Sequence, residues 1–403
     1  MDVGLDRLPL HTSLLARLRG KHVGLLAHPA SVDRALVHAA EVLRRAKVQP
    51  AIFFGPEHGY GGEAQDMVGV ASAADARTGA PIVSLYGDGF DDLSPRPEHL
   101  AGLDVLLVDL ADVGSRYYTF VWTALLALRA AHRAGVPVIL LDRPNPIGGL
   151  ASQAEGATQA SGFLSFVGLE PVPVRHSLTV GELVAHCAAR EGLPLGPDGA
   201  LAVVAVRGWD RARTAAAWDR PFVLPSPNMP TADTALVYPG GCLIEGTNLS
   251  EGRGTTRPFE IVGAPWIDGH ALAEGLAALD LGGFRARALT FRPMFQKHAG
   301  ALCGGVQIHV TDEAAWKPVA TYVALTALAR AQDPERFRFR TERYEYVDTI
   351  PAFDLLTGSA EARRAIEAGA DMREVALRAS AVDPGWPEAM RAAQEAAGRA
   401  ALV

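Results

Sequence analysis

The sequence predicts an α/β protein built on a parallel β-sheet, and two observations support this prediction. Short apolar runs alternate with segments of helical period along the first half of the chain, and such strand–helix–strand alternation is typical of parallel sheets. The runs are also apolar through their middles, as in residues 104–109, which is expected of strands covered on both faces. After about residue 264 the pattern changes, so we expect a smaller second domain there.

Each strand of the expected sheet is a short apolar run that ends in polar or turn residues. The six runs lie at residues 22–28, 48–54, 81–86, 104–109, 135–141 and 201–206. The helices between them are expected at residues 35–46 and 120–133. Ser31 or Asp33 is the expected N-cap of the first of these helices. A further helix is expected after Thr179, because Glu182 completes a capping-box pattern three residues later.

The second half of the chain is less regular. Residues 221–266 are rich in proline and glycine and are expected to be mostly irregular, and a polar loop of that length is usually functional or disordered. Strands are expected near Phe291 and at 305–310. Helices are expected at 318–331, 360–368 and 387–400. We therefore expect a larger domain at 1–263 and a smaller α+β domain at 264–403.

Composition excludes several classes of partner. The 403 residues carry a formal net charge of −7, which argues against nucleic acid or an anionic membrane as the main partner. The three cysteines are far apart and show no disulfide framework or zinc spacing. The chain shows no leader-like start and no apolar stretch approaching the roughly 18 residues of a membrane span. We expect a cytoplasmic protein that acts on a small molecule.

The stretch Phe54–Asp66 carries the first candidate site. It continues the second expected strand, and Gly55-Pro56 marks a turn. Glu57 and His58 follow directly, and three glycines come soon after. Ligands of open α/β sheets bind beyond the carboxyl ends of the strands, so Glu57 is in a suitable place for proton transfer. The alternative is that Glu57 and His58 are polar residues of a solvated loop.

Further polar groups follow the fourth and fifth expected strands. They are Asp109, Asp112 and Arg116, and then Asp142, Arg143 and Asn145. Because the strand ends of a parallel sheet share one edge, these groups are expected to converge near Glu57. The alternative for the aspartates is that they cap backbone N–H groups of the loops. The alternative for Arg116 is a surface stack with Tyr117 and Tyr118.

A second candidate group lies in residues 244–260, which combine three carboxylates, two arginines and an asparagine. These are Glu245, Glu251, Glu260, Arg253, Arg257 and Asn248. Glycines every few residues allow the backbone to approach a ligand closely, and arginine side chains bind carboxylates bidentately. The alternative is an exposed, charge-balanced loop. Asn228, held between the prolines of 225–230, is a third candidate, and the alternative there is a rigid connector.

Two carboxylates facing each other across a cleft are what glycoside hydrolysis needs, one to protonate the leaving oxygen and one to activate water or attack the sugar. Phe54 and Tyr60 flank the Glu57 loop and are expected to desolvate Glu57, which favours the protonated form of an acid catalyst. Dinucleotide-binding, Walker A and nucleophile-elbow motifs are absent from the sequence. We expect no cofactor and no metal, and the alternative is a metal held by His28, His58 and strand-end aspartates.

The motifs of the chain, taken together and in order, resemble one protein family. They are Phe54-Gly-Pro-Glu-His-Gly59, Asp112-Val-Gly-Ser-Arg-Tyr-Tyr-Thr119, Leu141-Asp-Arg-Pro-Asn-Pro146, Pro173-Val-Arg-His176, Ser226-Pro-Asn-Met-Pro230, Glu245-Gly-Thr-Asn-Leu-Ser-Glu-Gly-Arg-Gly-Thr255, Pro258-Phe-Glu260 and Gly305-Val-Gln-Ile-His-Val310. The chain resembles, over nearly its whole length, the exo-β-N-acetylmuramidase family NamZ, which was long described as a domain of unknown function, DUF1343.

The resemblance implies a Rossmann-like N-terminal domain, a smaller C-terminal domain and an active site in the cleft between them. It implies release of N-acetylmuramic acid (MurNAc) from the non-reducing end of peptidoglycan fragments, as part of cell-wall turnover and recycling. The glutamate of the family's Gly-Pro-Glu-His-Gly motif, its catalytic residue, falls on Glu57, with His58 beside it. Glu245 or Glu251 would supply the second acidic group.

Two positions depart from the family pattern, and both affect expected sugar contacts. Ala111 replaces the usual glutamine, and residues 154–157 read Ala-Glu-Gly-Ala in place of Val-Glu-Gly-Pro. One of the four arginines at 116, 143, 253 and 257 is expected to bind the lactyl carboxylate of MurNAc by a bidentate pair. The residues expected to bind substrate are Arg116, Tyr117, Asp142, Arg143, Asn145, Asn228, Asn248, Arg253 and Arg257.

Two alternative functions and two points of mechanism stay open from the sequence. The same fold would also suit a muropeptide-binding protein without activity, or a metal-dependent hydrolase. The anomeric outcome is open as well, because a carboxylate separation of roughly 5–5.5 Å indicates retention and roughly 6.5–9.5 Å indicates inversion. Assistance by the 2-acetamido group of the substrate is a further possibility.

Overall fold

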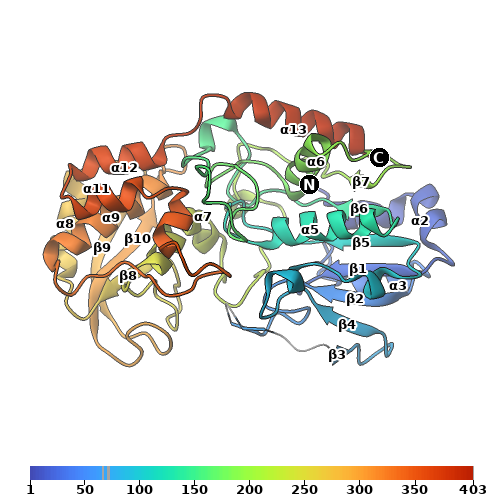
Figure 1. Cartoon of the computed structure of the whole chain (residues 1–403), viewed down its shortest axis with the longest axis horizontal. Helices are drawn as coiled ribbons and strands as arrows, with labels where there is room; N and C mark the ends of the chain where they lie inside the picture. The colour runs from blue at the N-terminus through green and yellow to red at the C-terminus, as the bar shows by residue number, and fades with distance from the viewer. Residues whose placement is uncertain (66–67, 70–72, 403) are drawn as a thin grey trace.

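The computed structural model describes residues 1–65, 68–69 and 73–402. Asp66, the last residue of the Phe54–Asp66 stretch, lies outside the described residues. Figure 1 shows two bodies side by side, a larger one that holds most of the first half of the chain and a smaller one that holds most of the rest. Among the described residues, no helix is long and apolar enough to cross a membrane.

The larger body is built on a seven-stranded sheet. Its strands are β1 (Val23–Ala27), β2 (Pro50–Gly55), β3 (Ala73–Ala74), β4 (Pro81–Ser84), β5 (Val105–Asp109), β6 (Val138–Leu141) and β7 (Leu201–Val204). They lie in the order β3-β4-β2-β1-β5-β6-β7, and every pair is parallel except the short edge pair β3–β4. The predicted α/β fold with a parallel sheet is confirmed, and all six predicted strands are present.

Helices cover both faces of this sheet, which explains the uniformly apolar strands. One face packs against α5 (Phe120–Arg133) and α6 (Val180–Arg190), in a core that includes Leu106 and Leu140. The other face packs against α1 (Gly4–Arg7), α2 (Thr12–Leu18) and α3 (Ala39–Arg45), in a core that includes Leu107. Consecutive residues of one strand thus point into different cores. Helix α4 (Pro97–Leu100) precedes β5.

The helix caps agree with the sequence in one case and differ in another. Thr179 caps α6 and forms the expected capping box with Glu182. The cap of α3 is His38, which accepts a hydrogen bond from the Ala40 N–H, so the prediction of Ser31 or Asp33 is wrong. Asp33 instead accepts from the N–H groups of a turn before the helix, in which Leu36 has a φ of +61°. The turn includes residues 35–38, which were predicted to be the start of the helix, so α3 begins at Ala39.

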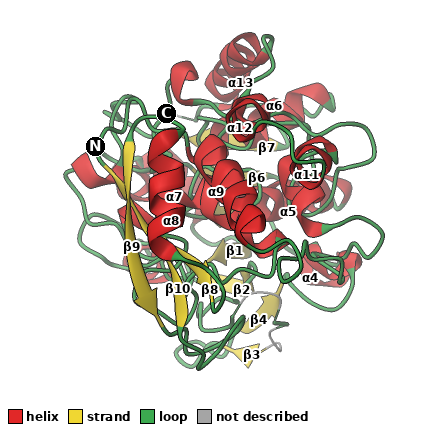
Figure 2. Cartoon of the chain, turned by 90° about the vertical axis from the view of Figure 1, so that its left-hand side faces the viewer, coloured by secondary structure: helices red, strands yellow, loops and turns green. Residues whose placement is uncertain are grey.

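The smaller body contains an antiparallel sheet with the order β8-β10-β9. Its strands are β8 (Ile261–Ala264), β9 (Phe284–Phe291) and β10 (Cys303–Val310). Its helices are α7 (Ala232–Gly241), α8 (Gly269–Ala278), α9 (Pro318–Gln332), α10 (Ala352–Thr357), α11 (Glu361–Glu367) and α12 (Met372–Ser380). Figure 2, which looks onto the smaller body, shows α8 and α9 beside the strands of this sheet. A small α+β unit was expected and is present.

Residues 221–266 are irregular over most of their length, as expected, but the segment also contains α7, a 3-10 turn at 242–246 and β8, which the sequence did not predict. Helix α7 shows no amphipathic period, since eight of its ten residues are buried, and it contains Pro239. The two glycines at its end allow close packing, because a Cβ on Gly240 would lie 2.2 Å from the carbonyl oxygen of Pro318. The proline and glycine content therefore led to the prediction of a loop where the structure has a buried helix.

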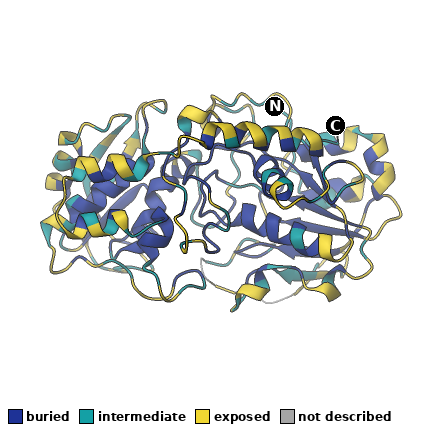
Figure 3. Cartoon of the chain, turned by 45° about the horizontal axis from the view of Figure 1, so that its top comes forward, coloured by how far each residue is buried: buried dark blue, intermediate teal, exposed yellow. Residues whose placement is uncertain are grey.

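The last helix, α13 (Trp386–Ala400), returns to the larger body. It lies along α6 at the top of Figure 1, and Figure 3 shows its exposed residues facing outward. Trp386 Nε1 donates to the carbonyl of His176 at 3.2 Å, and the Leu402 N–H donates to Val203 at 2.8 Å. The tail therefore packs on the first sheet, although the sequence groups it with 264–403. The division at residue 263 stays a prediction, and it falls within β8.

Candidate active site

A cavity lies where the two bodies meet. The larger body contributes residues after β2 and at the start of α5, and the smaller body contributes residues from α7 onward. The residues proposed from sequence that line it are Glu57, His58, Tyr117, Asn228, Glu245 and Arg253. Other lining residues include Thr119, Tyr118, Tyr238, Phe259, Tyr344 and Glu345. Segments far apart in the chain thus meet at one hollow.

Glu57 lies just beyond the carboxyl end of β2, in a tight turn. The Gly59 N–H donates to the Pro56 carbonyl at 2.9 Å, and His58 has a φ of +69°. The chain then folds back so closely that a Cβ on Gly55 would lie 2.2 Å from the backbone nitrogen of Tyr60. This return holds the Glu57 side chain at the cavity, where it is 7% exposed.

The carboxyl group of Glu57 is held by the start of α5. Thr119, the N-cap residue of that helix, donates from Oγ1 to Glu57 Oε2 at 2.8 Å. His58 lines the same cavity, and its Nδ1 lies 2.8 Å from the carbonyl oxygen of Ala64. Tyr60, expected to desolvate Glu57, instead packs on Phe53 with ring centroids 5.2 Å apart. Phe120 and Tyr118 line the cavity beside Glu57 instead.

Aromatic rings form one wall of the cavity. Tyr118 contacts Phe120 and Tyr238 edge to face, with centroids 4.9 and 5.6 Å apart. Tyr238 contacts Phe259 at 4.8 Å in the same manner. The hydroxyl of Tyr117 donates to the carbonyl of Pro239, so this ring ties α5 to α7. An aromatic wall of this kind suits the apolar face of a sugar ring, and it links the two bodies.

The smaller body contributes a buried charge cluster. Arg253 Nη2 donates to Glu245 Oε1 at 2.7 Å, and Arg253 Nε lies 3.2 Å from Glu251 Oε1. Lys297 Nζ lies 2.8 Å from Glu251 Oε2. Tyr344 donates from its hydroxyl to Glu245 Oε2 at 2.7 Å. Burial opposes ionisation of Glu251, but Lys297 and Arg253 outweigh it and lower the pKa of that carboxyl.

These contacts separate the two candidate acids of this segment. Glu245 and Arg253 line the cavity, whereas Glu251 lies behind them and is 1% exposed. Glu251 therefore acts on the cavity through Arg253. The charges of Glu245 and Glu251 are balanced by Arg253 and Lys297, as buried charges require.

Sequence reasoning missed Glu345 and the tyrosines on either side of it. Glu345 lines the cavity and is 6% exposed. Tyr86, just beyond β4, donates from its hydroxyl to Glu345 Oε2 at 3.1 Å. No strand end or glycine-rich stretch precedes Glu345, so the pattern that found Glu57 did not apply. The available signal was an acid placed between two aromatic residues, Tyr344 and Tyr346.

Arg116 was predicted to bind substrate but holds loops together. Its guanidinium donates to the carbonyls of Ala157, Val172 and Leu356 at 2.6, 2.8 and 2.6 Å. The side chain is fully buried, and burial lowers its pKa to about 10. Since Leu356 belongs to the smaller body, Arg116 joins the two bodies rather than lining the cavity.

Asp142 and Asn145 also serve local structure. Asp142 accepts hydrogen bonds from Thr179 Oγ1 and the Gly181 N–H, each at 2.8 Å, and burial raises its pKa to about 6. Asn145 donates to the Leu178 carbonyl at 3.0 Å. Gly114 has a φ of +78°, and a Cβ there would lie 2.2 Å from the amide oxygen of Asn145. Asn145 thus fixes the loop that leads to Thr119.

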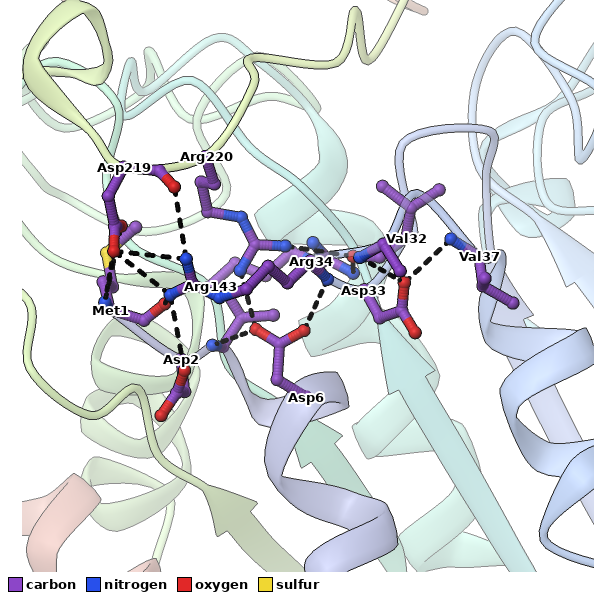
Figure 4. A network of polar contacts seen from close by, with 12 residues as sticks. Met1, Asp2, Asp6, Val32, Asp33, Arg34, Val37, Arg143, Asp219 and Arg220 are labelled. Atoms are coloured by element: carbon purple, nitrogen blue, oxygen red, sulfur yellow. Dashed lines mark hydrogen bonds and ion pairs between the residues drawn. The ribbon is translucent and has the colours of Figure 1, made fainter.

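Arg143 lies in a separate polar network near the N-terminus, shown in Figure 4. It forms an ion pair with Asp109 and donates to the carbonyl of Val32 at 3.1 Å. Nearby, Arg220 donates to Asp6 at 2.7 Å. The network lies beyond β1, β5 and β6 and is not part of the Glu57 cavity lining. The strand-end groups share one edge, as expected, but they divide into two clusters.

Asn248 and Arg257 lie outside the cavity lining as well. Asn248 is bonded to the backbone of residues 336 and 338. Arg257 is 42% exposed and lies 3.5 Å from Glu260. Asn228 does line the cavity, and its Nδ2 donates to Gln65 Oε1 at 2.9 Å. This bond links the 225–230 loop to the glycine-rich loop after Glu57.

Within the described residues, no three His, Cys, Asp or Glu side chains are arranged to hold a metal ion. His28, part of the metal alternative, is 1% exposed. Its Nε2 accepts a hydrogen bond from the Ala111 N–H at 2.8 Å, and its buried position lowers its pKa. His28 therefore stabilises the loop after β5.

Comparison with known proteins gives the family. Residues 23–233 match the family model described as exo-β-N-acetylmuramidase NamZ, N-terminal, and residues 236–383 match its C-terminal counterpart. The chain belongs to the NamZ exo-β-N-acetylmuramidase family. A NamZ relative, the peptidoglycan β-N-acetylmuramidase NamZ of Bacillus subtilis (strain 168), is 41% identical over 360 residues, which cover 89% of this chain and 83% of that protein.

Two solved structures of DUF1343 family proteins from Bacteroides fragilis NCTC 9343 share the fold. One superposes with a TM-score of 0.84 at 30% identity, covering 98% of this chain and 97% of its own. The other has a TM-score of 0.72 at 25% identity and covers 100% and 98%. The resemblance to NamZ inferred from the motifs is thereby confirmed.

Proposed function

We propose that the protein acts as an exo-β-N-acetylmuramidase at the Glu57 cavity, releasing MurNAc from the non-reducing end of peptidoglycan fragments in cell-wall turnover. NamZ family membership supports the activity. One observation supports the site: Glu57 is bonded to Thr119 inside a cavity that both bodies line. Ligand sites commonly lie at such domain interfaces.

Glu57 is the general acid in this proposal. The Thr119 hydroxyl donates to Oε2 and holds the carboxyl group that gives its proton to the glycosidic oxygen. Glu57 is almost fully buried beside aromatic rings, at the wall of the cavity that would hold the sugar. Proton transfer makes the departing GlcNAc a neutral alcohol.

The cavity walls define the sugar that fits. The ring wall of Tyr118, Tyr238 and Phe259 offers a surface for a pyranose face. Of the four arginines considered for the lactyl carboxylate, only Arg253 is among the described residues that line the cavity. We therefore assign that contact to Arg253, in addition to its ion pairs with Glu245 and Glu251.

The test is release of MurNAc from the MurNAc-GlcNAc disaccharide by the wild type and by Glu57→Gln. The variant should lose activity by about 10²–10⁴-fold, the usual contribution of a general acid. The control is Glu98→Gln, because Glu98 is exposed on the larger body. Activity of Glu57→Gln close to that of the wild type would remove Glu57 from the acid role.

The same assay separates the alternatives. Tight binding of the disaccharide without sugar release would favour a binding protein, and loss of activity after exhaustive chelation would favour a metal-dependent enzyme. The cytoplasmic location stays a prediction, which cell fractionation tests. The absence of nucleic-acid partners stays a prediction as well.

A further inference from the structure

Glu345 and Tyr346 form the centre of a strained turn in the smaller body. Tyr344 and Val347 exchange both backbone hydrogen bonds, at 2.8 and 2.9 Å, and the two residues between them have φ values of +43° and +70°. A two-residue turn with positive φ at both positions favours Asn-Gly. Bulky residues there are costly, and such strain persists chiefly at functional sites.

The turn is fixed against the larger body and directs Glu345 into the cavity. Tyr346 donates from its hydroxyl to the Gly87 carbonyl at 2.9 Å, and its ring contacts Tyr86 edge to face at 5.8 Å. Tyr86 in turn donates to both oxygens of Glu345, at 3.3 and 3.1 Å. The surrounding contacts therefore determine the position of this carboxylate.

Glu345 and Glu57 approach the same cavity from opposite bodies. Burial raises the pKa of the Tyr86 phenol, and the charges of Glu57 and Glu345 raise it further. Tyr86 therefore lies close enough to interact with both carboxyl groups. Glu57 and Glu345 thus present one carboxyl group from each body to the cavity. One protonated and one ionised carboxyl is the arrangement that glycoside hydrolysis needs.

The other two candidate acids are less suited to the second role. Both oxygens of Glu245 are bonded to groups of the smaller body, one to Arg253 and one to Tyr344. Glu251 does not line the cavity and is paired with Lys297.

We propose that Glu345 is the second catalytic carboxylate, the group that accepts the proton of the attacking water; this rests on the proposed function. Glu57 gives its proton to the glycosidic oxygen as the bond from C1 to that oxygen breaks, and the electron pair goes to the oxygen. The water oxygen bonds to C1, and its proton passes to Glu345. The products are free MurNAc and a GlcNAc with a free hydroxyl, and solvent returns the proton from Glu345 to Glu57.

The test compares Glu345→Gln and Glu57→Gln on two substrates, the MurNAc-GlcNAc disaccharide and a 4-nitrophenyl MurNAc glycoside. The nitrophenyl group leaves without help from an acid, so Glu57→Gln should lose much less activity on the glycoside than on the disaccharide. Glu345→Gln should lose about 10²–10⁴-fold on both substrates alike, because water must be activated in each case. The matched control is Glu342→Gln, an exposed residue of the same segment, which should keep wild-type rates.

A second variant separates catalysis from structure. Asparagine tolerates positive φ better than glutamate does, so Glu345→Asn should unfold in urea at or above the wild-type midpoint while activity falls as in Glu345→Gln. A residue that served only to shape the turn would show retained activity in this variant.

Each outcome decides between the two proposals. Near-wild-type rates for folded Glu345→Gln or Glu345→Asn would overturn the role of Glu345, while the proposed function would stand. If Glu345→Gln lost activity on the disaccharide but not on the nitrophenyl glycoside, Glu345 would be acting as a general acid. That result would also overturn the proposal that Glu345 activates water. Absence of MurNAc release by the wild type on either substrate would instead contradict the proposed function itself.

Discussion

Single residues in the cavity wall have distinct energetic roles. Glu245 and Arg253 form an ion pair at 2.7 Å in which both side chains are at most 9% exposed. The guanidinium of Arg253 also lies over the Phe259 ring, 5.1 Å from its centroid. A buried charge that loses its partner is strongly destabilising, so this pair maintains the wall as well as its charge.

Glu245→Gln should lower the free energy of unfolding by about 3 kcal/mol, the lower end for a broken buried pair, because Glu251 still faces Arg253. Urea unfolding measures the change. The matched control is Glu374→Gln, since Glu374 and its partner Arg378 are 58% and 79% exposed, and the expected loss there is below about 0.5 kcal/mol. Equal losses in the two variants would show that the buried pair contributes no more than a surface pair.

For single residues, the sequence predicted which polar side chains lie at the ends of strands better than it predicted what those side chains do. Glu57 was found because an acid directly after a strand end has a defined place in an α/β sheet. Asp142 and Asn145 follow a strand in the same way, yet their bonds to Thr179 and Leu178 bury them in local structure. Which partner a polar side chain finds depends on distant segments, and no local pattern records it.

Individual elements show how the chain joins its two bodies. The carboxylate of Glu155, in the larger body, accepts a hydrogen bond from the Ala320 N–H at 2.9 Å, at the start of α9 in the smaller body. An acid at the N-terminus of a helix is favourable because of the helix dipole and the open N–H groups. Burial nevertheless raises the pKa of Glu155 to about 7. This joint between the bodies should therefore respond to pH.

The folded protein keeps the Glu155 proton up to about pH 7, whereas the unfolded chain releases it near its ordinary value of 4.5. Between these values the folded state holds more protons, so this group lowers the free energy of unfolding as pH rises. Glu155→Gln keeps an acceptor for Ala320 and removes the titration. Its stability relative to the wild type should rise by about 3 kcal/mol from pH 4.5 to 7.5.

Urea unfolding of both proteins at several pH values measures this difference. Asp142, whose pKa is raised to about 6, titrates in both proteins, so its contribution cancels. Parallel pH profiles for the wild type and Glu155→Gln would contradict the role of Glu155.

Element prediction worked where a local signal existed. The helix from Phe120 to Arg133 and the Thr179 cap were found at their observed bounds, because period and capping are local. Helix α7 was missed because it is buried on nearly all sides and contains Pro239. The Tyr344–Val347 turn was missed because Glu and Tyr occupy positions where the turn type favours Asn and Gly.

The whole molecule creates a site that neither body contains alone. Glu57 and Thr119 belong to the larger body, whereas Glu345, Glu245 and Arg253 belong to the smaller one. Contacts such as Arg116 to Leu356 and Tyr346 to Gly87 hold the bodies together. A two-domain α/β fold could be predicted from the order of strands and helices. The return of α13 and the pairing of acids across the bodies could not, because both depend on long-range packing.

The most direct test of the account is a crystal structure of Glu57→Gln with the MurNAc-GlcNAc disaccharide bound. We expect the sugar in the cavity between the bodies, with the side-chain amide of residue 57 within about 3.2 Å of the glycosidic oxygen and Glu345 facing the opposite side of C1. A disaccharide bound in another hollow, with residue 57 remote from the glycosidic oxygen, would contradict the account.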